Sequence, residues 1–132
     1  MRTGSENTPP LLLIEPDPDL QTFFTALLRE EGYALVPVAT LEEGFGLVEE
    51  QAFALVLAEV RVGHAFPDLQ QVQALRARDY PVPVAVLARL PLPPSAKPTE
   101  FAFVLPLPFN IEACLGLIAT TLNTPLNATQ HA

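Results

Sequence analysis

Residues 11–20 read LLLIEPDPDL, and they predict the unit from which the rest of the chain is built. The first four residues are all apolar, as in a strand that is buried on both faces of a parallel sheet. Asp17 is a favourable helix N-cap, and Pro18 is favoured at the first helical position. Gly32 ends a helical pattern of apolar residues: Leu20, Phe23, Phe24, Leu27 and Leu28. The stretch therefore predicts a strand followed directly by an amphipathic helix.

The same strand and helix unit recurs along the chain. Further apolar strands are predicted over residues 33–38, 53–58, 82–87 and 101–105. Thr40 and Glu43 form a capping box for a second helix with Leu41, Phe45 and Val48 on its inner face. The last helix is expected to start after Asn110, with Ile111, Cys114, Leu115, Ile118 and Leu122 facing inward. Strands that alternate with helices predict an α/β fold with a five-stranded parallel sheet covered on both faces.

The segment before the last strand departs from this pattern. Residues 89–100 include Pro91, Pro93, Pro94 and Pro98, and a proline inside a helix costs about 3 kcal/mol. We expect a proline-rich loop in place of the fourth helix. The sheet beside this loop would then expose an apolar interaction surface, formed by Leu90, Leu92, Phe101 and Phe103. An unpaired edge strand there could also add a strand from a partner.

Composition favours one globular domain. The chain has 132 residues, 49% hydrophobic and 17% charged. We expect the domain at residues 11–122, between a disordered segment at 1–10 and a flexible tail at 123–132. A net charge of -8 disfavours binding to nucleic acid or to an anionic membrane. The lone Cys114 needs no oxidising compartment, and no run is long enough for a signal or membrane segment, so a cytoplasmic protein is expected.

Four segments together carry a resemblance to the receiver domains of bacterial response regulators. They are residues 11–20, 54–59, 81–88 and 106–109, in the order and spacing of that family. The resemblance implies a doubly wound sheet with the flavodoxin-like strand order 2-1-3-4-5. In such receivers an aspartate accepts a phosphoryl group beside Mg²⁺, which acidic side chains hold. A lysine pairs with the phosphate, and a hydroxyl residue moves to hydrogen-bond it.

The matching positions of this chain lack that chemistry. Glu59 stands at the acceptor position, Glu15 and Pro16 at the acidic pair, Ala88 at the hydroxyl position, Val104 at the aromatic switch and Leu107 at the lysine. Pro16 has no side-chain ligand for a cation, and Leu107 has no positive charge to offset a transferred phosphoryl group. The sequence therefore predicts no catalytic residue, no metal site and no cofactor.

The interpretation that we favour is a phosphorylation-independent pseudo-receiver, a protein-interaction module in signal transduction that binds a protein partner or itself. One alternative is a phosphorelay receiver, in which Glu59 or Asp17 accepts a phosphoryl group or Glu59 permanently mimics one. A carboxylate carries one charge where a phosphoryl group carries about -1.5 to -2. A second alternative is a small-molecule sensor that binds its ligand in the crevice at the carboxyl end of the sheet. Glu59 could also be a strand-end carboxylate that is hydrated at the surface or paired with Arg61. His64 and Cys114 suggest a nucleophile pair, but Cys114 is expected in the core.

Overall fold

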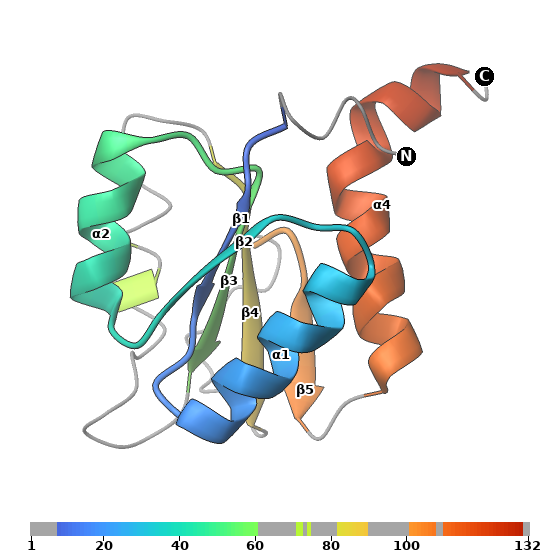
Figure 1. Cartoon of the computed structure of the whole chain (residues 1–132). Helices are drawn as coiled ribbons and strands as arrows, with labels where there is room; N and C mark the ends of the chain where they lie inside the picture. Colours follow the sequence, from blue (N-terminus) through green and yellow to red (C-terminus); the bar gives the residue numbers. More distant parts are fainter. Residues whose placement is uncertain are drawn as a thin grey trace.

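The computed structural model describes residues 8–60, 71, 72, 74, 82–89, 101–107 and 110–130. The elements follow in the order β1 (Leu11–Ile14), α1 (Pro18–Glu30), β2 (Leu35–Val38), α2 (Leu41–Glu50), β3 (Leu55–Val60), β4 (Val84–Arg89), β5 (Val104–Leu107) and α4 (Ile111–Gln130) (Figure 1). All five strands are parallel and lie in the order β2-β1-β3-β4-β5. The predicted fold class and strand order are confirmed.

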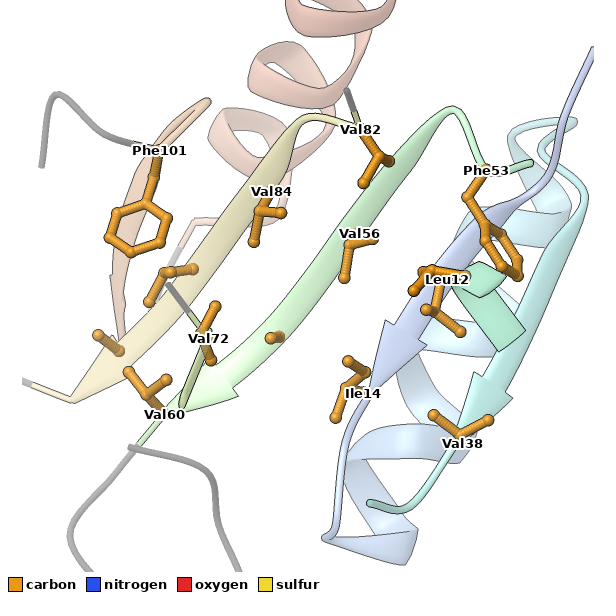
Figure 2. Packing of buried hydrophobic residues seen from close by; sticks show 14 residues of the cluster. Leu12, Ile14, Val38, Phe53, Val56, Val60, Val72, Val82, Val84 and Phe101 are labelled. Atoms are coloured by element: carbon orange, nitrogen blue, oxygen red, sulfur yellow. The ribbon is translucent and has the colours of Figure 1, made fainter. Parts of the chain in front are cut away.

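Helices cover both faces of this sheet, α1 and α4 on one side and α2 on the other (Figure 1). Because successive side chains of a strand point to opposite faces, each strand contributes to two separate cores. The core against α1 and α4 is rich in leucine and includes Leu13, Leu57, Phe24 and Ile118. The core against α2 is rich in valine and alanine. Its members include Leu12, Ile14, Val56 and Val84, which stand on the same side of the strands in Figure 2.

The starts of three helices agree with the caps that the sequence predicts. Asp17 Oδ1 accepts hydrogen bonds from the backbone N–H groups of Asp19 at 2.9 Å and Leu20 at 3.3 Å. Thr40 and Glu43 form the reciprocal capping box of α2. Asn110 Oδ1 accepts from Ala113 N at 3.0 Å at the start of α4. These bonds satisfy N–H groups that the first helical turn leaves without an intrahelical partner.

The last strand begins three residues later than predicted, at Val104 rather than Phe101. Phe101 is 7% exposed and Phe103 is 8% exposed, and they belong to the cores on opposite faces of the sheet. The prediction that these two side chains form an exposed apolar surface is therefore wrong, because they fill the two cores at the start of the strand. The loop was predicted over residues 89–100, but Arg89 is the last residue of β4. The rest of that segment, including Leu90 and Leu92, lies outside the described residues.

Two helical side chains and the end of the last helix also differ from expectation. Phe23 and Ile111 are each 42% exposed, because they lie at the margin of their helices' apolar stripes. Phe23 instead contacts Phe24 edge to face, with ring centroids 5.6 Å apart. The last helix extends to Gln130, past Leu122, where the apolar stripe ends. The segment predicted as a flexible tail therefore begins as helix, and the side-chain Nδ2 of Asn123 donates to the Ala119 carbonyl at 2.8 Å.

Both edge strands of the sheet contain a proline. The carbonyl groups of Ala34 and Val38 accept hydrogen bonds from β1, so by alternation the nitrogen of Pro37 in β2 points away from the sheet. The Phe103 carbonyl likewise accepts from β4, which directs the nitrogen of Pro106 in β5 outward. Proline has no N–H, so neither edge offers a donor at these positions, and strand addition by a partner is disfavoured.

Candidate functional site at the carboxyl end of the sheet

Two glutamates lie side by side where β1 and β3 reach the carboxyl end of the sheet. Ile14 pairs with Ala58 in the strand register, and Glu15 and Glu59 are the next residues along the two strands. The backbone N–H of Glu15 donates to the Val38 carbonyl at 2.9 Å, so the sheet bonding continues through Glu15. Both glutamates are 0% exposed. Since adjacent strands lie about 4.8 Å apart, two carboxyl side chains are buried as close neighbours.

The segment after β1 is tied to the start of α1. Glu15 Oε2 accepts from the backbone N–H of Asp17 at 3.2 Å, and Gln21 Nε2 donates to the Glu15 carbonyl at 3.1 Å. The Asp17 carboxylate serves as the N-cap of α1. Pro16, between them, has no polar side chain. The acidic residues of this segment are therefore engaged in local structure.

Burial of these carboxyl groups has an electrostatic cost. Moving a carboxylate out of water is unfavourable unless hydrogen bonds or opposite charges compensate, and a second like charge nearby adds to the cost. A bound cation could offset such charges. Within the part of the chain that the structure describes, however, no three His, Cys, Asp or Glu residues come together in a way that could hold a metal ion.

Glu59 lies within β3 and not at its end. The strand runs to Val60, two residues beyond its predicted end, and Glu59 pairs with Leu87 of β4. Its burial excludes the interpretation of a carboxylate hydrated at the surface. Arg61, its other expected partner, lies outside the described residues. A charged side chain at the end of an apolar run is normally exposed to solvent, so nothing in the sequence indicated that Glu59 would be buried.

The two positions that correspond to the receiver switch come together on the α2 face. Ala88 is 0% exposed and pairs with Val60 and Pro106, while Val104 packs against the same valine-rich core. Glu59 alternates with Ala58 and Val60 of that core, so its side chain is directed to the other face. The backbone of Leu107 pairs with Arg89 at the end of β5. Its side chain lies outside the described part of the chain.

Sequence comparisons find neither a protein-family model nor a curated protein that matches this chain. Solved structures match over nearly its whole length. The N-terminal domain of a response regulator/sensory box/GGDEF protein from Carboxydothermus hydrogenoformans is 14% identical, with a TM-score of 0.74 over 91% of this chain and 98% of that one. The chain has the receiver fold.

Other receiver domains give the same result. The receiver domain of the Francisella response regulator 1452 is 14% identical, with a TM-score of 0.74 over 89% of this chain and 99% of that one. A CheY-like receiver domain from Methylobacillus flagellatus is 17% identical, with a TM-score of 0.73 over 86% and 98%. Among the described residues, no helix is both long enough and apolar enough to span a membrane.

Proposed function

We propose that this chain is a pseudo-receiver, a module that binds a protein partner in cytoplasmic signal transduction and accepts no phosphoryl group. The supporting observation is the complete burial of Glu59 within β3. Phosphoryl transfer requires the attacking and leaving oxygens to lie roughly in line across the phosphorus atom. A donor cannot approach a carboxyl group that is 0% exposed in this way unless the strand end opens.

The residues at the other positions that correspond to receiver chemistry support the same proposal. Ala88 has no hydroxyl group to hydrogen-bond a phosphate, Pro16 supplies no side-chain metal ligand, and Leu107 supplies no positive charge. In phosphoryl transfer, positioning and electrostatic stabilisation account for nearly all of the catalysis, so their loss removes the reaction itself. A receiver fold without this chemistry retains its surface, and recognition of a protein is the function that remains.

The experiment is incubation of the full chain with Mg²⁺ and acetyl phosphate, followed by intact-mass spectrometry. We expect no gain of a phosphoryl group. The triple variant Glu59→Asp, Ala88→Thr, Leu107→Lys is the matched comparison, because it restores the acceptor, the hydroxyl and the cation. Stoichiometric phosphorylation of the natural chain would overturn the proposal.

Partner binding needs a separate test. The immobilised chain should retain a specific protein from extract of its own cell, equally with and without acetyl phosphate in the buffer. Retention that requires the phosphodonor would favour a conventional phosphorelay receiver.

A further inference from the structure

A pocket of about 380 Å³ opens at the amino end of the sheet. It lies between the end of α2 and the starts of β3 and β4, and its lining residues are Val48, Glu49, Glu50, Gln51, Ala52, Phe53 and Val82. This is the opposite end of the sheet from Glu15 and Glu59, because α2 begins beside the carboxyl end of β2 and runs back (Figure 1). The volume lies within the range of about 300–1,000 Å³ that is typical of small-molecule pockets.

The floor of the pocket is apolar and well anchored. Val48, Phe53 and Val82 are 4%, 7% and 9% exposed and all belong to the valine-rich core. Figure 2 shows Phe53 and Val82 at the amino ends of β3 and β4. The rim, residues 49–52, is exposed to solvent. A ligand could therefore bury an apolar stem on the floor while a polar group stays at the rim.

Charge at the rim is negative. Glu49 and Glu50 line the pocket, and the C-terminal carbonyl groups of α2 carry the negative end of the helix dipole. The last turn of α2 has no basic residue. In contrast, α1 also ends in two glutamates, Glu30 and Glu31, but has Arg29 in its last turn. The end of α2 thus combines two glutamates, a last turn without a basic residue and a pocket.

We propose that this pocket binds an organic cation, a guanidinium or ammonium group on a short apolar stem, presented as an arginine or lysine side chain by the protein partner. The proposal rests on the interaction function inferred above for the source of the cation. The stem would pack on Phe53 and Val82, and the cation would lie at the rim beside Glu50. An amphipathic side chain of this kind buries its methylene groups while its charge stays hydrated.

The test is titration of the ¹⁵N-labelled full chain with n-butylguanidinium, a single guanidinium on a four-carbon stem, observed by NMR. We expect shifts at residues 48–53 and at Val82, and weaker binding at high salt. n-Butylurea, the uncharged analogue with the same alkyl stem and a urea head, should bind at least several-fold more weakly. Equal binding of the two compounds, or an absence of shifts at the pocket, overturns the proposal without bearing on phosphorylation.

Variants test the charge and the floor separately. Glu49→Gln with Glu50→Gln should weaken n-butylguanidinium binding roughly threefold or more, since exposed ion pairs contribute modestly. Glu30→Gln with Glu31→Gln makes the same charge change at the end of α1 and should have little effect. Ala52→Leu should weaken binding by filling the pocket from an exposed position. If the two double variants lose affinity for the guanidinium compound equally, the effect is one of overall charge and the proposal is overturned.

The source of the cation is tested with a blocked Gly-Arg-Gly peptide. Binding of this peptide at the same residues, at least as tight as that of n-butylguanidinium, supports recognition of a partner's side chain. Binding of n-butylguanidinium but not of the peptide overturns that source and leaves a free small molecule as the ligand.

Discussion

The Cδ1 atom of Ile14 lies 2.8 Å from the position that a Cβ atom would occupy at Gly44, and Cγ1 of Ile14 lies 3.3 Å from it. Helix α2 therefore packs against β1 so closely that a Cβ atom at this position would require the Ile14 side chain to shift. Ile14 is 0% exposed and sits in the valine-rich core, so its side chain has little room to move away. This contact sets the distance between α2 and the sheet.

Gly44→Ala should destabilise the protein relative to Gly46→Ala by about 1–3 kcal/mol, the usual cost of overpacking a core. Gly46 lies in the same helix, and a Cβ there would meet nothing within 4 Å. Both variants share the helix-propensity gain of alanine over glycine, about 1 kcal/mol, so their difference isolates the packing. Chemical denaturation measures it. In an Ile14→Val background, which lacks Cδ1, the difference should shrink; an unchanged difference would locate the strain elsewhere.

Replacement of Glu59 by glutamine should leave stability at neutral pH unchanged or higher. Glutamine keeps the shape of the side chain and removes one of two neighbouring buried charges. Glu42→Gln, an exposed position in α2, is the control for a charge change in this acidic chain. A loss of more than about 1 kcal/mol on denaturation would show that the Glu59 carboxylate makes a net favourable contact. Loss of partner binding by a folded Glu59→Gln protein would instead support the constitutive mimic.

The buried thiol of Cys114 should make stability fall in alkaline solution. Burial raises the pKa of this thiol from 9.0 to about 11. Its contribution is fully present below pH 9.0, the value of the unfolded chain, and is lost as the pH rises through about 11. The loss is about 2–3 kcal/mol. Cys114→Ala should lack this step in a denaturation series at rising pH. In the native protein at neutral pH, thiol reagents should label Cys114 only at the rate of unfolding.

Pro37→Val and Pro106→Val should promote self-association through the edges of the sheet. Each substitution restores an outward N–H on a strand that is at the edge of the sheet among the described residues. The Arg29 guanidinium already occupies the Leu35 carbonyl, with an Nη2 to O distance of 3.1 Å, so the β2 edge is doubly protected. Pro106→Val should therefore associate more readily than Pro37→Val. Light scattering at increasing protein concentration measures this, and two variants as monodisperse as the natural chain would contradict it.

Local chemistry made much of the fold predictable from the sequence. Asp17, Thr40 and Asn110 cap their helices as expected, because a cap depends on only a few neighbouring residues. The strand order followed from the resemblance. The exposures of Phe23 and Ile111 were not predictable, since an apolar stripe does not reveal how much of its width the sheet covers.

The site was harder to predict than the fold. Its positions could be located in the sequence, but the burial of Glu59 depends on β3 continuing to Val60. The pocket at the amino end had no sequence signal at all. Its lining comes from residues 48–53 and from Val82, and neither stretch carries a motif. Only the packing of α2 against the starts of two strands brings them together.

The unequal composition of the two cores has a consequence for how the chain selects its strand alignment. In a sheet buried on both sides, hydrophobicity alone does not distinguish one alignment from another shifted by one residue. Differences in side-chain volume do distinguish the two alignments. Such a shift in β3 would move Leu55 and Leu57 into the space shaped for Val56 and Ala58, and leave voids on the other side. The alternation of large and small apolar residues thus helps to fix the register of the strands.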